Sequence, residues 1–231
     1  MIGGLILMPE FKTENAFVLS ARPLGEKSWI ISLLTRENGR FLGVYNKKKP
    51  FDVGTFVSAR WNARLNEQLG TFYLEEAKPL SALYLDDSKR LSVISSLCAL
   101  LDDTLPERQA FPDLYDRTID FLNLLEGPDF LKHYALLEKE LLTEIGFGFD
   151  LSGCAGGGDP ADLAYISPKT GRAVSREKGL PYHNKLLALP GFFWKETPAT
   201  PQDIQDALHL TGYFLIQHSP KHRLPKIRER L

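Results

Sequence analysis

The sequence is poor in cysteine and contains no long apolar run. Its 231 residues include two cysteines, Cys98 and Cys154, the first in a helical pattern and the second in a glycine-rich segment. Two distant cysteines do not make a disulfide framework, which favours a reducing compartment. No apolar run reaches about eighteen residues, and the opening 2–8 lacks a basic region and a cleavage site, so we expect a cytoplasmic protein without a membrane segment.

Catalytic signatures are also missing. There is no Gly-x-Ser-x-Gly elbow and no His-Glu-x-x-His motif. The glycine run Gly156–Asp159 is not followed by Gly-Lys-Ser/Thr, which favours a turn over a phosphate loop. The acidic pairs Asp86–Asp87 and Asp102–Asp103 fall at expected helix ends, where caps and solvated faces explain them better than a metal pair does. An enzyme acting on nucleic acid is the weaker alternative, and divalent-metal-dependent cleavage would distinguish it.

The charges that are present are segregated along the chain. Net charge is −1 overall, and 43% of residues are hydrophobic, which is ordinary for a globular protein. Residues 1–79 carry 11 Lys and Arg against 8 Asp and Glu, residues 80–150 carry 6 against 14, and residues 151–231 carry 11 against 7. Basic ends therefore flank an acidic middle, which we interpret as a scaffold or protein-docking element and not as a surface for a polyanion.

A hairpin running into three lysines is the most informative local feature. Residues 28–36 are rich in β-formers, Asn38-Gly39 supplies the positive-φ residues of a tight turn, and residues 41–45 resume an apolar strand. Lys47–Lys49 begin where pairing is expected to end. A basic loop beside a small sheet with aromatic residues is typical of a single-strand nucleic-acid platform, although we expect most of these rings to be core. The rings are Trp29, Phe41, Tyr45, Trp61, Phe72 and Tyr73.

The first third of the chain predicts a small barrel. It contains five short strand patterns without an intervening helical pattern, as expected for a five-stranded OB-fold barrel. The predicted strands are residues 16–21, 28–36, 39–45, 55–62 and 71–77. With the helices described next, these strands predict an α+β multidomain fold.

After Pro79 the apolar period becomes helical. Residues 91–101 and 114–125 show helical spacing, and a third helix is expected from Pro128-Asp129 to Gly146. Residues 146–191 are a loop-rich module with little core. Thr200–Asp203 is a capping sequence for a last helix, which we expect to pack on the helical bundle. The basic tail after Pro220 is either a second phosphate contact or a solvated end.

These segments, in this order, resemble the RecO family of bacterial recombination mediators. The resemblance is carried by AFVLSARPLGEKSWIISLLTRENGRFLGV, WNARLNEQLGTFYLEEA and LLTEIGFGFDLSGCA, and continues through LAYISPKTGRAVS, LPYHNKLLALPGFF and DALHLTGYFL. It implies an OB-fold nucleic-acid-binding domain over 1–79, a helical domain over 80–147, a loop-rich module over 148–195, and a C-terminal helix with a basic tail over 196–231.

The chain departs from the family pattern in two places. The module resembles a zinc-binding module, but Cys154 holds the first ligand position while Gly157, Ser175 and Lys178 stand near the other three. Because a structural zinc needs four ligands, we expect no metal, and no other cofactor is implied. The loop after the hairpin is also shorter than in many relatives and less rich in arginine.

The resemblance implies a non-enzymatic, nucleoid-associated mediator of DNA repair. It would bind single-stranded DNA, and duplex DNA as a further ligand, anneal complementary strands, and act with RecR to load RecA onto DNA coated by single-strand-binding protein. The candidate DNA contacts are Arg36, Arg40, Lys47, Lys48, Lys49, Arg60 and Arg64. The candidate cations for the acidic, aromatic-ended tail of single-strand-binding protein are Arg117, Lys132 and His133, whose alternative role is an exposed helix face. The alternative function is a generic OB-fold adaptor for single-stranded nucleic acid.

Overall fold

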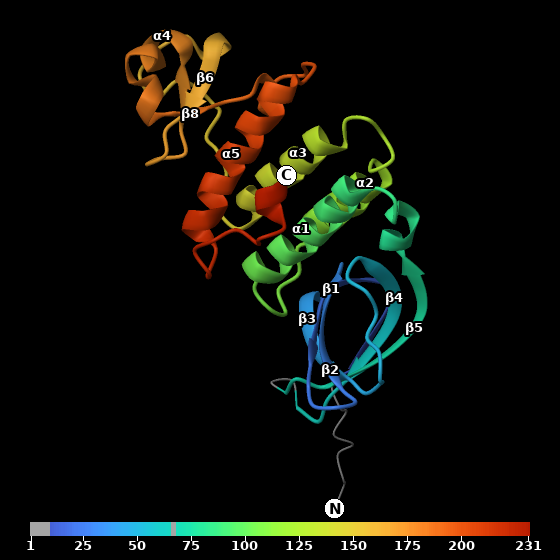
Figure 1. The fold of residues 1–231 in the computed structure, drawn as a ribbon. Coiled ribbons are helices and arrows are strands. Elements are labelled where there is room, and N and C mark those ends of the chain that lie inside the picture. The colour runs from blue at the N-terminus through green and yellow to red at the C-terminus, as the bar shows by residue number, and fades with distance from the viewer. Residues whose placement is uncertain (1–9, 66–67) are drawn as a thin grey trace, which may run out of the picture. The chain divides into compact units, whose positions relative to one another are not determined.

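The computed structural model describes residues 10–65 and 68–231, and is shown in Figure 1. The chain divides into two compact units, Met1–Tyr115 and Asp116–Leu231. The apolar opening at residues 2–8 lies outside the described residues. Among those described, no helix is long and apolar enough to cross a membrane.

The first unit is built on five strands that close into a barrel (Figure 1). They are β1 (Glu10–Pro23), β2 (Trp29–Thr35), β3 (Gly39–Tyr45), β4 (Thr55–Asn62) and β5 (Thr71–Pro79). The order around the barrel is β1-β2-β3-β5-β4, with β4 paired back to β1. Only the β3–β5 pairing, through Val44 and Thr71, is parallel among the described barrel pairs. An N-terminal sheet of this order, followed by helices, is consistent with the predicted OB-like domain.

Strand β1 is longer than the sequence pattern predicts, because it pairs with both β2 and β4. Its apolar stretch Ala16–Leu19 is buried, whereas residues 10–14 alternate between exposed and half-buried side chains. The register of β1 shifts between Val18 and Ser20 against β2, and between Thr13 and Ala16 against β4. Such irregularities bend a strand, which lets one long strand cross from one partner to the other and close the barrel.

Side chains along the strands point alternately into and out of the barrel, and several of those that point inward are aromatic. Phe41, Tyr45, Trp61 and Phe72 are buried, and Trp29 packs against them half-buried. The prediction that these rings are core is therefore confirmed for five of the six. Tyr73 is the exception, since it points outward from β5 and is 48% exposed.

The turn of the β2–β3 hairpin differs from the predicted two-residue turn. Thr35 pairs with Gly39, which leaves a three-residue loop, and Gly39 has φ of 66° while Asn38 is not in the positive-φ region. A type I turn closed by a left-handed glycine has this form. Gly39 is also required for space, since a Cβ there would lie 1.7 Å from the carbonyl oxygen of Gln109.

Helix α1 (Ser88–Thr104) follows a short 3-10 helix, η1 (Leu80–Tyr84), and packs against β1 within the first unit. Asp87 caps the start of α1 by accepting hydrogen bonds from the backbone N–H groups of Lys89 and Arg90, as the sequence predicts. Beyond the helix, the backbone N–H of Arg108 donates to the carbonyl of Arg40 in β3 at 2.7 Å. The segment after α1 therefore lies beside the β2–β3 turn.

Helix α2 (Pro112–Asn123) leads into the second unit, where α3 (Phe130–Glu144) packs against α5 (Pro201–His218). Helix α5 begins where the sequence predicts, and Thr200 and Asp203 form the expected capping box. Helix α3 begins at Phe130, two residues after the predicted start at Pro128. Between α3 and α5 a small module contains a three-stranded sheet with the order β7-β6-β8. Its elements are η2 (Pro160–Asp162), β6 (Leu163–Ile166), β7 (Ala173–Ser175), α4 (Arg176–Gly179), η3 (Leu180–Lys185), β8 (Leu187–Ala188) and η4 (Gly191–Phe193).

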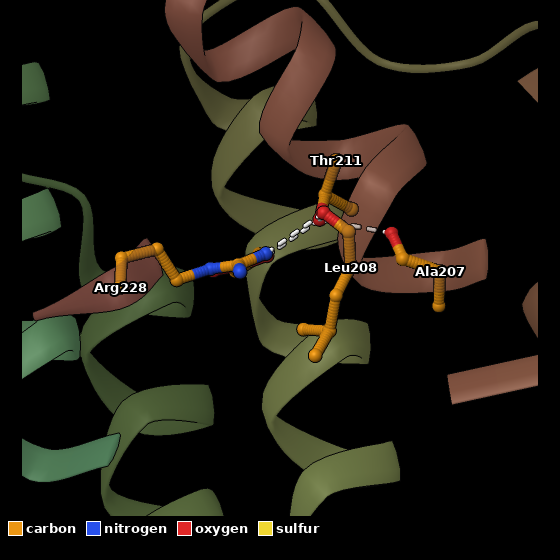
Figure 2. Close-up of polar contacts among 5 residues, drawn as sticks. Ala207, Leu208, Thr211 and Arg228 are labelled. Atoms are coloured by element: carbon orange, nitrogen blue, oxygen red, sulfur yellow. Dashed lines mark hydrogen bonds and ion pairs between the residues drawn. The ribbon is translucent and has the colours of Figure 1, made fainter. Parts of the chain in front are cut away.

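The basic C-terminal segment is anchored at its end, at the short helix η5 (Arg228–Arg230). The guanidinium of Arg228 points toward α5, where it donates to the carbonyl of Leu208 at 2.9 Å (Figure 2). It also donates to both carboxylate oxygens of Glu138 on α3, which accepts a further hydrogen bond from Thr211. One of the tail's cations is therefore part of the core and unavailable to an external phosphate.

Candidate nucleic-acid interface

The three lysines form the tip of a short loop that is fixed on both sides. The Oγ of Ser28 donates to the Oδ1 of Asn46 at 2.8 Å, immediately after β3 ends. On the other side, the ring of Phe51 packs on that of Tyr45 with centroids 5.7 Å apart. Lys47–Lys49 lie between these anchors and are exposed. The loop therefore presents three ammonium groups to solvent from a defined base.

Strand pairing places two further cations at the same end of the barrel. Thr71 pairs with both Val44 and Asn62, so the last residues of β3 and β4 lie together, and Arg64 follows directly. Pro23 pairs with Trp29, and Trp29 with Tyr45, so the β1–β2 loop with Lys27 is also at this end. We call this surface the lysine end, which consists of Lys27, Lys47, Lys48, Lys49 and Arg64, all of them exposed.

The lysine end coincides with the loops that OB-folds use for ligands. Oligonucleotides bind OB-folds along strands 2 and 3 and between the β1–β2 and β4–β5 loops. Here those loops contribute Lys27 and Arg64, and the β3–β4 loop adds the three lysines. Lys27 was not among the candidates chosen from the sequence, because its position next to Lys47 depends on strand register and not on sequence spacing.

Arg40 has a structural role instead. Its side chain is 16% exposed and forms an ion pair with Asp102 of α1 at 3.3 Å. Its Nε donates to the carbonyl of Leu105 at 2.7 Å, just beyond the end of that helix. A cation at a helix C-terminus satisfies free carbonyls and opposes the helix dipole. Arg40 therefore fixes α1 to the barrel.

The remaining two candidate arginines lie away from the lysine end. Arg36 is exposed at the β2–β3 turn, which is at the opposite end of the hairpin from Tyr45. Arg60 is exposed on the outer wall of the barrel, with its guanidinium carbon 4.8 Å from the centroid of the Tyr73 ring. The seven candidates are thus divided among two ends and one wall.

In the second unit, α2 and α3 border an apolar hollow whose polar lining is mixed in charge: Arg117, His133, Asp120 and Glu140. Its volume is about 240 Å³ and its apolar lining includes Phe121, Leu124 and Leu137. Arg117 and His133 both line the hollow, and Arg117 is 3.9 Å from the carboxylate of Glu140. Lys132 is not part of this hollow, because its ammonium donates to the carbonyl of Thr197 at 3.2 Å. We call this site the α2–α3 hollow.

Of the four positions that resemble a zinc knuckle, Cys154 and Ser175 are hydrogen-bonded to each other, and Gly156 and Gly158, on either side of Gly157, lie close to Lys178. The backbone N–H of Ser175 donates to the Sγ of Cys154 at 3.1 Å, and a Cβ at Gly158 would lie 2.1 Å from the Ser175 hydroxyl. Burial acts to raise the pKa of Cys154, but hydrogen bonds from Ser175, Gly158 and Gly156 lower it to about 7. Within residues 10–65 and 68–231, no three His, Cys, Asp or Glu side chains group to hold a metal ion.

The architecture is that of a multidomain protein with an OB-like barrel followed by helices. Two family models match it: Recombination protein O N terminal over residues 8–82, and Recombination protein O C terminal over residues 85–227. The chain belongs to the RecO family of DNA repair proteins.

Individual relatives agree with the family models. The chain is 44% identical to a DNA repair protein RecO of Rhodospirillum centenum over 214 residues, which cover 89% of this chain and 86% of the relative. It is 40% identical to that of Rhodospirillum rubrum over 235 residues, covering 94% and 93%. The resemblance inferred from the sequence is therefore confirmed over nearly the whole chain.

Proposed function

We propose that this chain is a non-enzymatic mediator of DNA repair that binds single-stranded DNA at the lysine end. The proposal is carried by one observation: three loops of an OB-like barrel bring five exposed cations to the end where OB-folds hold oligonucleotides. Membership of a family of DNA repair proteins supports DNA as the ligand.

Such a surface suits strand annealing. Cations that neutralise phosphates release condensed counterions and offset the repulsion between two backbones, without reading sequence. Because these contacts do not distinguish one backbone from another, duplex DNA is expected to bind as well. The mediator would anneal complementary strands and, together with RecR, help RecA load onto DNA coated by single-strand-binding protein.

The α2–α3 hollow is the proposed docking site for the acidic tail of single-strand-binding protein. An acidic peptide with an aromatic end needs an apolar depression bordered by donors for its carboxylates. Here Arg117 and His133 supply the donors beside Phe121 and Leu137, and Asp120 and Glu140 in the same lining limit the affinity for an anion. The acidic character of residues 80–150 keeps DNA away from this surface. Binding to a partner and binding to DNA would then use separate parts of the chain.

We also propose the four-part division with boundaries near residues 79, 147 and 195, and a cytoplasmic, nucleoid-associated location. In this division residues 148–195 are a metal-free form of a zinc-binding module, in which hydrogen bonds to Cys154 replace ligand bonds.

A strand-annealing assay, with and without the cognate single-strand-binding protein, tests the function. Wild-type protein should accelerate annealing of bare and of coated complementary oligonucleotides. Lys47→Glu/Lys48→Glu/Lys49→Glu should lose most of this activity, whereas Lys169→Glu/Lys178→Glu/Lys185→Glu, with the same change in net charge, should retain it. Absence of annealing by the wild-type protein would refute the mediator function, and equal activity of the two triple variants would refute the lysine end.

A further inference from the structure

Three exposed side chains form a row across the outer wall of the barrel. Lys12 of β1 pairs with Arg60 of β4, and Arg60 pairs with Tyr73 of β5. Adjacent strands are about 4.8 Å apart, so the three side chains stand next to one another on the same face. We call Lys12, Arg60 and Tyr73 the wall row.

The wall row borders a hollow and includes an exposed aromatic ring. The hollow has a volume of about 330 Å³ and is also lined by Ser58, Ala59 and Glu75. The ring of Tyr73 is 48% exposed, while its neighbours along β5, Phe72 and Leu74, point inward and are buried. The core beneath the row is therefore filled without the Tyr73 ring.

The wall row places two like charges side by side. Lys12 and Arg60 are cations directly opposite each other on paired strands, which is destabilising in the absence of a counter-charge. Lys12 forms an ion pair with Glu14 at 3.1 Å, but the two side chains are 70% and 68% exposed. Ion pairs that are this exposed contribute little to stability. An anion near Lys12 and Arg60 would relieve their repulsion.

We propose that the wall row is a nucleotide subsite, in which an unpaired base stacks on Tyr73 and Arg60 while Lys12 contacts a phosphate. Aromatic rings and guanidinium planes both stack on bases of any sequence, and the guanidinium of Arg60 already lies over the Tyr73 ring. Glu75, at the Tyr73 side of the hollow, repels a phosphate there, so the phosphate is assigned to the Lys12 side.

The subsite rests on the proposed binding of single strands and extends it beyond the lysine end. Arg60 and Arg64 are four residues apart on and just after β4, a span of at most about 13 Å at 3.3 Å per residue. A single strand that leaves the lysine end can therefore follow β4 to the wall row. A duplex cannot use the subsite in the same way, because its bases are stacked inside the helix.

Binding of two probes tests the subsite: a thymidine oligonucleotide, and an abasic oligonucleotide of the same length and charge. Tyr73→Ala should lower affinity for the thymidine probe about tenfold and leave affinity for the abasic probe unchanged, as expected for the loss of one stacked base. Tyr73→Phe, which keeps the ring, should bind like the wild-type protein. Tyr182→Ala removes another exposed ring, in the second unit, and should have no effect. An unchanged affinity of Tyr73→Ala for the thymidine probe, or an equal loss for both probes, would overturn the proposal.

The same titrations separate this subsite from the lysine end. Lys47→Glu/Lys48→Glu/Lys49→Glu should weaken both probes equally, because the lysines contact only phosphates. If the triple variant binds both probes normally while Tyr73→Ala loses affinity for the thymidine probe alone, the wall-row subsite is supported and DNA binding at the lysine end is refuted. If only the triple variant binds the probes more weakly, DNA binding at the lysine end is supported and the wall-row subsite is refuted.

Discussion

The guanidinium of Arg228 and the carboxylate of Glu138 form a bidentate pair in the interior of the second unit. Their side chains are 5% and 1% exposed, and they join the C-terminal segment to α3 across 90 residues of sequence. Thr211 of α5 donates to the same carboxylate, so three separate segments meet at one buried charge. The opposing charge of Glu138 holds the pKa of Arg228 above its ordinary value despite burial.

Breaking this pair should destabilise the protein strongly. Arg228→Met leaves the Glu138 carboxylate buried without its counter-ion, which typically costs about 3–5 kcal/mol of unfolding free energy. Arg228→Met/Glu138→Leu should recover most of that loss, because neither charge remains. Arg230→Met, at an exposed position two residues away, should change stability by less than about 0.5 kcal/mol. Urea unfolding of the wild-type protein and the three variants measures these differences. Equal effects of Arg228→Met and Arg230→Met would show that loss of the Arg228–Glu138 pair does not destabilise the protein.

Local signals in the sequence predicted much of the fold. Strand β4 has the predicted bounds, and the Thr200–Asp203 capping box forms as expected, because both depend on neighbouring residues. The pairings of Arg40 and Arg228 were not predictable in this way. Their partners are 62 and 90 residues distant, and an arginine in a basic segment has the same sequence signal whether it is solvated or buried.

In the candidate site, too, features that depend on neighbouring residues could be predicted and features that depend on distant residues could not. The exposed lysine loop could be predicted, because it depends on where one hairpin ends. The grouping of Lys27 and Arg64 with it, and the alignment of Lys12, Arg60 and Tyr73, depend on strand register, which a single sequence does not specify. The outward position of Tyr73 was missed because an aromatic residue in a strand pattern is more often core.

The salt dependence of single-strand binding should report the lysine loop directly. Each phosphate contact contributes about −0.7 to the slope of log K against log salt concentration. Lys47→Glu/Lys48→Glu/Lys49→Glu should therefore reduce the magnitude of the slope by about 2 and weaken binding to all sequences equally. Fluorescence anisotropy at several salt concentrations gives the slope. Lys169→Glu/Lys178→Glu/Lys185→Glu is the charge-matched control, and a slope that is equal in both variants would contradict a contact at the loop.

The two cysteines should differ sharply in reactivity. Hydrogen bonds lower the pKa of Cys154 to about 7, so its alkylation rate should rise as pH increases through about 7 and then level off. Burial raises the pKa of Cys98, so this thiol should react only on unfolding. Mass spectrometry after timed iodoacetamide treatment distinguishes the two sites. An alkylation midpoint near pH 9 would show that the hydrogen bonds to Cys154 are not maintained in solution.

The module that contains Cys154 should not depend on metal. Only one of the four expected ligand positions has a thiol, so elemental analysis should give less than one zinc per chain, and chelator should not lower the melting temperature. Cys154→Ser should change stability by less than about 1 kcal/mol, since Cys154 is partly exposed. One tightly bound zinc per chain would prove the metal-free module wrong.

A peptide of the acidic, aromatic-ended tail of single-strand-binding protein should bind the α2–α3 hollow with Kd on the order of micromolar, as expected for a small apolar contact with exposed charges. Arg117 is 56% exposed in the lining of the hollow, so Arg117→Glu should weaken binding about fivefold and make it less sensitive to salt. Leu124→Ser removes an exposed apolar side chain from the same hollow and should weaken binding without altering its salt dependence.

Lys132 provides the matched control, because it neighbours His133 in sequence but binds the carbonyl of Thr197 outside the hollow. Lys132→Gln should bind the peptide like the wild-type protein, and none of these variants should change affinity for bare single strands. Isothermal titration with the intact peptide, and with one lacking its terminal aromatic residue, measures each case. If Lys132→Gln weakens binding as much as Arg117→Glu does, the tail docks on the Thr197 side of α3, and the apolar hollow is not its site.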